Sequence, residues 1–493
     1  MKSLFRAPYS SLLHRCWRPV AAMSLVLLPS FLMAQTKQEI TIGIGIQNTT
    51  TNTVTGGVAI KELKLFEKYM PKTSKYKNID FKLDWQNFTS GPPIINGMMA
   101  KKLQIGMMGD YPLLVAGATG QSQPGNETKL VAVIAYNAFG SGNGIVVHKD
   151  SPYYQLSDLK GKLVSVPFGS AAHGMVLQAL QAGGYPADFF NLVSQSPEVG
   201  TTNLQERKID AHADFVPFAD LLPYRGFARK IFDGVQTGVP TFHGVIVRDD
   251  FAKEYPEVVV AYIRALIDAN AWMHADPAAA TAKVEEWTKI EKEVAYLYLG
   301  RGGIHTLDPT IKPRWLETIK TGHDVLTKLK RVKPLDINAW VDESYVREAY
   351  KQLHLDYEQQ KQSFSQYDIV GYDKLCKRPI SRPFEAGEVW IEGGAIEPFS
   401  SPLCTLAAIG KYEAEGKKIG ASYLTDNALH IKVFADQAFY AVDTTNPKNL
   451  VVVPFLLKTD AQAHATKIGG KLATYTDALA LATQAAALAS TGK

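Results

Sequence analysis

Short strand-like runs alternate with helix-like runs over the first half of the chain, and this alternation restricts the fold more than any other feature. Between Ile40 and Asp250, the runs ITIGIGI, IDFKLDW, LQIGMMG and LVAVIAY are short and rich in β-forming residues. The runs GGVAIKELKLFEKYM, PPIINGMMAKK and GMVLQALQAGG instead carry apolar residues at helical spacing. This pattern predicts parallel sheets covered by helices.

The rest of the chain divides into two further regions. With 493 residues, the chain is long enough for about three ordinary domains. The pattern is almost entirely helical from Asp249 to Leu355, and near Tyr367 it gives way to a segment rich in Pro, Gly and charge. Beyond this linker, strand-like runs precede an Ala-rich tail, which predicts a separate small α+β domain.

The charge balance argues against a nucleic-acid partner. The net charge of +5 comes from 53 basic and 48 acidic side chains that are spread along the chain. No sustained Lys/Arg block of the kind that binds nucleic acid interrupts this distribution.

The first 34 residues have the pattern of a secretory signal. Lys2, Arg6, Arg15 and Arg18 precede the apolar run AAMSLVLLPSFLMA, and Ala34 offers a cleavage point. The alternative is an uncleaved anchor, but the run is shorter than the ~20 residues that a bilayer span needs. We expect residues 1–34 to be removed on export.

Export would place Cys376 and Cys404 in an oxidising compartment. A bridge between them would close a loop of about 29 residues and stabilise the fold by about 3 to 4 kcal/mol. Two independent thiols are the alternative, and the sequence leaves both readings open.

The stretch SVPFGSAAHGM, residues 165–175, predicts a strand, a turn at Gly169 and a helix that begins near Ser170. The first N–H groups of such a helix lack internal partners and, with the helix dipole, can hold an anion. His173 could add a donor. The alternative is that Ser170 only caps the helix and His173 packs in the core.

Three motifs in order resemble the periplasmic substrate-binding proteins of ABC importers for nitrate, taurine and alkanesulfonates. They are NFTSGPPIINGMMAKKLQIGMMGDYPLLVAG, LSDLKGKLVSVPFGSAAHGMVLQAL and LQERKIDAHADFVPFADLL, and the resemblance spans Ile40 to Leu355. It implies an α/β, type II periplasmic-binding-protein fold, in which two lobes are joined by two crossing segments and clasp the ligand. We therefore expect lobe one at 35–140 and 245–360, lobe two at 141–244, a linker at 361–383 and an added C-terminal domain at 384–493.

In folds of this kind, ligands lie on loops beyond the carboxyl ends of strands. Together with the resemblance, this rule places sixteen residues in the ligand site. They are Gln47, Asn48, Gln86, Phe88, Gly109, Asp110, Tyr111, Ser141, Gly169, Ser170, His173, Asp214, Phe215, Phe218, Phe242 and His243.

Two acidic residues depart from what an anion site requires. Ionised and unpaired carboxylates at Asp110 and Asp214 would repel an anion. These residues leave room for a zwitterionic or cationic ligand, and Phe215 stands where relatives often have a larger aromatic residue. The segment GATGQSQPGNETK, residues 117–129, has the composition of an exposed loop.

The stretch of about 45 residues from AFYAVDTT to TYTDAL, residues 438–479, resembles the end of NosL-type copper chaperones, and a weaker likeness extends back to Phe384. The matching features are a Pro-Phe strand, the DAQAHA helix and the GGKLATYTDAL ending. Copper is the cofactor that this resemblance implies, and Cys404 is the metal ligand that we can name, with His430 and His464 in the same domain. A domain that kept the fold but lost the metal is the alternative.

The leading hypothesis is a periplasmic receptor that captures a small polar or anionic molecule and delivers it to an ABC permease in the inner membrane. We expect a monomer. We also expect that the protein is not an enzyme, because no defensible catalytic motif appears in the sequence. One alternative is a pyrimidine-synthesis enzyme of the thiamin pathway, which shares the fold; the export signal argues against it. The other is a copper-trafficking protein that acts through the C-terminal domain.

Overall fold

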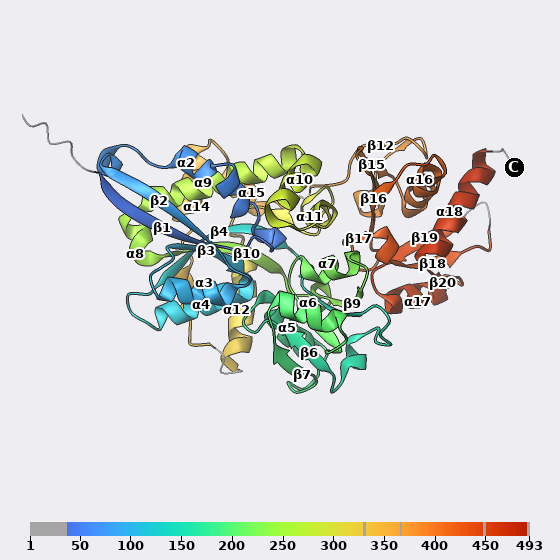
Figure 1. Ribbon diagram of the computed structural model, residues 1–493, viewed down its shortest axis with the longest axis horizontal. Helices are drawn as coiled ribbons and strands as arrows, with labels where there is room; N and C mark the ends of the chain where they lie inside the picture. The colour runs from blue at the N-terminus through green and yellow to red at the C-terminus, as the bar shows by residue number, and fades with distance from the viewer. Residues whose placement is uncertain (1–36, 329–331, 365–366, 447–449, 491–493) are drawn as a thin grey trace, which may run out of the picture.

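The chain forms two lobes, each built on one sheet, and a third α+β body at its C-terminal end (Figure 1). The computed structural model describes residues 37–328, 332–364, 367–446 and 450–490. The predicted signal segment, residues 1–34, lies outside the described residues. Among the residues described, no helix combines the length and apolar character that crossing a membrane requires.

The first lobe contains a six-stranded sheet. Across the sheet, the strands are β11 (Thr306–Leu307), β4 (Thr128–Asn137), β10 (Thr241–Arg248), β3 (Ile105–Gly109), β1 (Gln38–Ile46) and β2 (Ile79–Asn87). β1 is parallel to β2 and β3, as predicted, whereas β10 runs antiparallel to both β3 and β4. The expectation of an all-parallel sheet was wrong here, because β10 carries the chain back from the second lobe.

The second lobe contains a five-stranded mixed sheet. Its strands are β7 (Asn191–Ser194), β6 (Leu163–Val166), β8 (Ala211–Asp214), β5 (Gly144–His148) and β9 (Ala228–Asp233). β6 is parallel to β7 and β8, and β5 is antiparallel to β8 and β9. Its helices are α5 (Ala171–Ala182), α6 (Pro197–Gln205) and α7 (Phe218–Tyr224).

The first lobe also contains helices from both early and late parts of the chain (Figure 1). They are α1 (Val58–Glu62), α2 (Leu65–Tyr69), α3 (Gly91–Met99), α4 (Asp110–Gln121), α8 (Asp249–Glu254), α9 (Pro256–Ala275), α10 (Pro277–Thr288), α11 (Lys292–Leu299), α12 (Pro313–Lys328), α13 (Ile337–Trp340), α14 (Ser344–Gln352) and α15 (Tyr357–Gln362).

Two segments differ from the sequence-based expectations. The single helix expected over GGVAIKELKLFEKYM is broken into α1 and α2 at Lys64, whose φ is 54°. The exposed loop expected at 117–129 is mostly regular structure, because residues 117–121 complete α4 and Thr128 begins β4. Buried Gly117 packs against Trp340, so only the turn between these elements is loop.

Two crossing segments join the lobes and lie side by side. One leaves β4 after Asn137, the other enters β10, and the Gly234 N–H donates to the Asn143 carbonyl at 2.8 Å. Gly140 has a φ of +98°, and a Cβ there would lie 2.2 Å from the Val239 carbonyl oxygen. Only glycine fits this close approach, which fixes how the segments pass each other.

The C-terminal body contains two antiparallel sheets and three helices. The four-stranded sheet has β15 (Ile396–Phe399), β14 (Gly387–Ile391), β16 (Ile419–Thr425) and β17 (Lys432–Phe434); the three-stranded sheet has β19 (Val451–Phe455), β18 (Phe439–Asp443) and β20 (Lys471–Ala473). The helices are α16 (Pro402–Ala414), α17 (Lys458–Lys467) and α18 (Tyr475–Ser490), and a hairpin of β12 (Tyr372–Asp373) and β13 (Arg378–Pro379) precedes them. This is an α+β arrangement, as predicted.

A buried ion pair anchors this body to helix α11. Lys432 Nζ lies 2.6 Å from Glu388 Oε2, and both side chains are almost fully buried. The Tyr296 hydroxyl, on α11, donates to Glu388 Oε1 at 3.0 Å, and Lys432 also donates to the Arg301 carbonyl at 2.7 Å. The Tyr423 hydroxyl donates to the carbonyl of Glu293, the second residue of α11.

The same body also touches the second lobe. The rings of Phe434 and Tyr224, the last residue of α7, lie 5.0 Å apart, and Phe439 meets Tyr154 at 6.5 Å. Lys458 Nζ lies 4.0 Å from the centre of the Tyr154 ring. The C-terminal body therefore contacts both α11 and lobe two.

We predict that Lys432→Met weakens this attachment by about 3 kcal/mol or more, because it leaves the buried Glu388 carboxylate without its counter-charge. Hydrogen exchange measured by mass spectrometry on peptides from β14 and α11 reports the local opening. The paired change Glu388→Leu with Lys432→Met should restore most of the protection, since no buried charge remains. The exposed Lys411 to Glu415 pair, 3.8 Å apart, serves as the control, and Lys411→Met should change protection little. Equal effects at both lysines would contradict the prediction.

Candidate functional site

The two lobes meet where helices α4 and α5 begin. A Cβ on Gly109, which precedes α4, would lie 2.9 Å from the Ala171 Cβ at the start of α5. The Tyr111 ring lies 5.7 Å from the His173 ring, and a Cβ on Gly174 would meet Tyr111 at 2.7 Å. The lobes are thus closed against each other through small residues.

A cavity lies between the lobes beside this contact. α4 contributes Asp110, Tyr111 and Leu114; the crossing segments and the start of β10 contribute Gly140, Asn143, Thr237, Val239 and Thr241; α5 contributes Ala171, Gly174, Met175 and Gln178; α12 contributes Thr318, Ile319, Gly322 and Leu326. Residues of both lobes and of the crossings therefore line the cavity together, and residues of helix α12 complete its lining.

Asp110 is the carboxylate in this wall. The Tyr111 N–H donates to its Oδ1 at 2.6 Å. Burial raises the pKa of Asp110 to about 6, although hydrogen bonds from Thr241 and from the backbone N–H groups of Tyr111 and Phe242 act in the opposite direction. No Lys, Arg or His in the described residues forms an ion pair with it.

The strand, turn and helix predicted at 165–175 are present as β6, a turn at Gly169 and α5. Ser170 Oγ accepts the His173 N–H at 3.3 Å, so this residue caps the helix. The His173 Nδ1 accepts the Gly169 N–H at 3.1 Å, and Phe168 stacks on the His173 ring. The alternative with a capping Ser170 and a packed His173 is therefore present, and the anion seat at this helix start stays a prediction; α5 reaches the cavity through Ala171.

Several buried polar atoms near the crossings have no hydrogen-bond partner among the described residues. They are the Asn48 Oδ1, Thr51 Oγ1, Asn52 Oδ1, Ser141 Oγ and Asn143 Oδ1. The amide nitrogen of Asn52 lies 3.2 Å from His243 Nδ1 on β10, and Asn143 lines the cavity. Buried polar groups of this kind are satisfied by a ligand or by ordered water in most proteins.

Two histidines of this region are held in the neutral form. Burial lowers the pKa of His243 to about 3 and places that of His305 well below its ordinary value. His305 stacks on Tyr298 with ring centres 5.5 Å apart, and a Cβ on Gly142 would touch its ring. His243 also disfavours protonation of His305, so these two histidines carry no charge at neutral pH.

Asp214 lies away from the cavity, in the core of lobe two. Its carboxylate accepts from His212 Nε2 at 2.8 Å and from the Phe215 N–H at 2.8 Å, and His212 Nδ1 lies 2.6 Å from the Ser165 hydroxyl. Ser165, His212 and Asp214 are completely buried. This chain of contacts has the residue types of a hydrolase triad, but a substrate has no access to it, so its role is structural.

Most other predicted residues do not line the cavity. Gln86 donates to Asp84 on edge strand β2, and Gln47 donates to the Met107 carbonyl. The Phe88 N–H continues the β1 pairing through the Ile46 carbonyl. The remaining aromatic residues pack in the core: Phe215 against Phe218, and Phe242 against Trp315. Of the sixteen predicted residues, Asp110 and Tyr111 line the cavity.

Sequence reasoning missed Asn52, Asn143, His305 and helix α12. The signal for Asn52 was the run QNTTTNTVT, residues 47–55, since short polar side chains directly after a buried strand are unusual unless they face a site. Helix α12 is distant in sequence from the other residues that line the cavity, and no local sequence pattern predicts that it contacts them.

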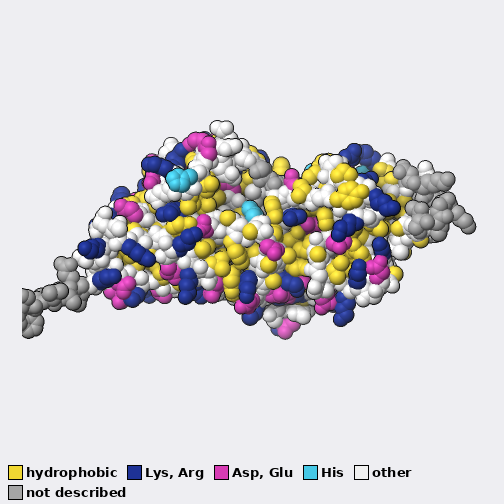
Figure 2. Space-filling model, turned by 90° about the horizontal axis from the view of Figure 1, so that it is seen from above, with side chains coloured by type: hydrophobic (Ala, Val, Ile, Leu, Met, Phe, Trp, Pro, Cys, Tyr) yellow, Lys and Arg dark blue, Asp and Glu magenta, His cyan; other side chains and the backbone are white. Residues whose placement is uncertain are grey.

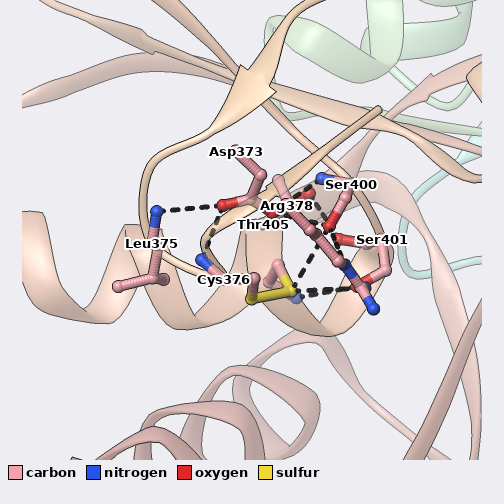
Figure 3. Close-up of a disulfide and its surroundings, with 8 residues drawn as sticks. Asp373, Leu375, Cys376, Arg378, Ser400, Ser401 and Thr405 are labelled. Atoms are coloured by element: carbon pink, nitrogen blue, oxygen red, sulfur yellow. Dashed lines mark hydrogen bonds between the residues drawn. A yellow bond between two sulfur atoms is a disulfide. The ribbon is translucent and has the colours of Figure 1, made fainter. Parts of the chain in front are cut away.

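Cys376 and Cys404, which are 28 residues apart in sequence, form a disulfide (Figure 3). Asp373 accepts from the Ser400 hydroxyl and the Cys376 N–H, and the Arg378 guanidinium points to Cys404 Sγ. The structure thus contains the disulfide, which is one of the two alternatives that the sequence left open. In this oxidised form Cys404 offers no thiolate, so the predicted copper ligand does not fit Cu(I) unless the bridge is reduced.

Comparison with known proteins associates the chain with solute-binding proteins. The model of the family described as NMT1/THI5 like matches residues 122–280. The taurine-binding periplasmic protein of Escherichia coli (strain K12) is 30% identical over 196 residues, 40% of this chain and 58% of that protein. A putative aliphatic sulfonates-binding protein of Bacillus subtilis (strain 168) is 24% identical over 206 residues, with the same coverage. The chain thus spans somewhat more than half the length of these curated relatives.

Solved structures share the fold. The alkanesulfonate-binding protein SsuA from Xanthomonas axonopodis pv. citri, bound to MOPS, matches with a TM-score of 0.53 and 19% identity over 62% of this chain and 99% of that one. The periplasmic nitrate-binding protein NrtA from Synechocystis PCC 6803 gives 0.50 and 14% over 66% and 92%. The chain therefore has the two-lobed periplasmic-binding-protein fold, with an additional α+β region at its C-terminus.

We predict that Asp110→Asn stabilises the ligand-free chain at high pH. The pKa of Asp110 is about 6 in the folded chain and near 4 in the unfolded chain. Between pH 4 and pH 6 the folded state therefore binds more protons than the unfolded state, and the free energy of unfolding falls as the pH rises through this range. Urea unfolding at pH 8 should show a gain of roughly 2 kcal/mol over the unchanged chain, and no gain at pH 4. The exposed Asp188→Asn is the control. An equal gain at both pH values would contradict the prediction.

Proposed function

We propose that this chain is an exported solute-binding receptor that captures a small polar molecule between its lobes and delivers it to an ABC importer. The observation that carries the proposal is the cavity between the lobes, which is lined by residues of both lobes, both crossings and helix α12, Asn143 among them. Binding requires only that the ligand favour the closed arrangement. The buried Ser165, His212 and Asp214 chain gives no reason to add catalysis.

The likeness to a periplasmic relative supports an exported location. Cleavage near Ala34 rests on the basic residues and apolar run that precede it. The names of the taurine- and sulfonate-binding relatives support a small ionic ligand. A permease partner in the inner membrane follows from the proposed receptor function. Figure 2 adds that Lys and Arg alternate with Asp and Glu over the face shown, so this face presents no single basic tract.

A thermal-shift panel on the mature chain tests the receptor function. The panel contains nitrate, methanesulfonate, 2-aminoethanesulfonate, simple alkylamines and amino acids. A ligand at one hundred times its dissociation constant should add about 2.7 kcal/mol of stability and raise the unfolding temperature. Asn143→Ala should abolish the shift, whereas Asp188→Asn, on the exposed surface of lobe two, should preserve it. A panel without any shift would argue against a receptor.

Copper handling by the C-terminal region is the second candidate function, and its support is a single cluster. Ligand atoms of Asp373, Cys376 and Cys404 lie within 4.8 Å of one another. Two thiolates released by reduction would be soft enough for Cu(I), whereas the disulfide is not. The likeness to NosL-type chaperones points in the same direction.

We predict that the full chain retains Cu(I) only after its disulfide is reduced. Equilibrium dialysis under anaerobic conditions, with and without prior reduction, measures bound copper per chain. Cys404→Ser should remove the retained copper, and His430→Ala, in the same region, serves as a comparison. Retention that is unchanged by Cys404→Ser, or no retention after reduction, would rule out this site.

A further inference from the structure

Strand β2 (Ile79–Asn87) is an open edge of the first sheet. It stands last in the strand order and, among the residues that the structure describes, pairs with β1 alone. Figure 1 shows it on the side of lobe one that lies away from the C-terminal body. Nine residues are long for an edge strand, and an uncovered edge of this length offers N–H and C=O groups to another strand.

The hydrogen bonds to β1 fix which backbone groups of β2 face outward. At one end the Gln38 N–H donates to the Asn78 carbonyl at 2.8 Å. At the other end the Phe88 N–H donates to the Ile46 carbonyl, also at 2.8 Å. Because the backbone groups of successive residues point to opposite sides of a strand, the even-numbered residues face β1. The odd-numbered residues of β2 therefore direct their N–H and C=O groups to the open edge.

The side chains of β2 divide between an apolar face and a charged face. The half-buried apolar side chains pack on the core of lobe one and are Phe81, Leu83 and Trp85. On the other face, Lys82 Nζ lies 2.8 Å from Asp80 Oδ2, and Gln86 donates to Asp84 Oδ2 at 2.7 Å. Carboxylates and hydrogen-bond donors thus alternate along this face.

We propose that β2 pairs in antiparallel fashion with β2 of a second copy of this chain, with Leu83 on the two-fold axis. In this register an odd-numbered residue always lies opposite an odd-numbered residue, so the outward N–H and C=O groups of the two strands meet as hydrogen-bonded pairs. On the apolar face, Phe81 lies opposite the partner subunit's Trp85, and aromatic pairs of this kind stabilise neighbouring strands.

The charged face fits a second copy because its order of charges is self-complementary. Lys82 lies opposite the partner subunit's Asp84, and Asp80 lies opposite the partner subunit's Gln86, so each carboxylate meets a donor. An axis at Lys82 or at Asp84 would instead place two like charges directly opposite each other, which is unfavourable. An axis at residue 81 or 85 would pair only residues 79–83 or 83–87 of each strand.

Sedimentation velocity of the full mature chain over a concentration series tests this pairing. One strand from each copy forms the contact, so we expect a weak dimer whose fraction rises with concentration. Lys82→Glu should weaken dimerisation about tenfold or more, since two symmetric ion pairs become repulsive. Lys82→Glu combined with Asp84→Lys exchanges the two signs and should restore the dissociation constant to within about threefold.

Lys411→Glu is the matched control. The Lys411 side chain is 55% exposed and that of Lys82 is 53% exposed, so the same charge change is made at a similar surface position on α16. This control should leave the dimer unchanged. Hydrogen exchange resolved to single residues gives a second measurement, because the outward amides of Phe81 and Leu83 should exchange more slowly as the concentration rises, whereas that of Asp84, which faces β1, should not change.

A chain that stays monomeric at every concentration, as the sequence analysis expects, would overturn the inference. So would a dimer that Lys82→Glu leaves intact, or one that the exchanged pair does not restore. The receptor function is measured by ligand binding, and these outcomes do not affect it.

Discussion

The close passage of the two crossing segments is the constraint on which the rest of the structure depends. Asn137 ends β4, and its side chain accepts from the N–H groups of Phe139 and Ser141 and donates to the Ile304 carbonyl. This one amide ties the first crossing to the helical region after α11. Gly140 packs against the second crossing, so the chain leaves and re-enters lobe one along the adjacent strands β4 and β10. The crossings then line the cavity together with α4 and α5.

Much of the fold could be predicted because its signals are local. The periodicity of apolar residues predicted the alternation of strands and helices. The residue types at Gly169 and Ser170 predicted the turn and the helix cap. The antiparallel return of β10 was missed because strand direction depends on where the chain comes from, which periodicity does not record. The break at Lys64 was missed because its apolar pattern continues across the kink.

The site was harder to predict than the fold because burial and contact are not local properties. Strand-end logic found Asp110 and Tyr111, but it also selected Asp214, whose carboxylate turns into the core of lobe two toward His212. A carboxylate at a strand end looks the same in sequence whether it faces a cavity or a histidine two residues earlier. Helix α12 comes from a region with helical patterning only, so its approach to the cavity is a product of tertiary packing.

The attachment of the C-terminal body to both α11 and lobe two has a consequence for how the receptor would rest without ligand. A rotation that separates α7 from α11 must break either the Tyr296 to Glu388 contact or the packing of Phe434 on Tyr224. The opened form is then penalised before any solute arrives, and the closed form is already populated. In the proposed receptor, preorganisation of this kind would tighten capture, since less binding free energy is spent on closure.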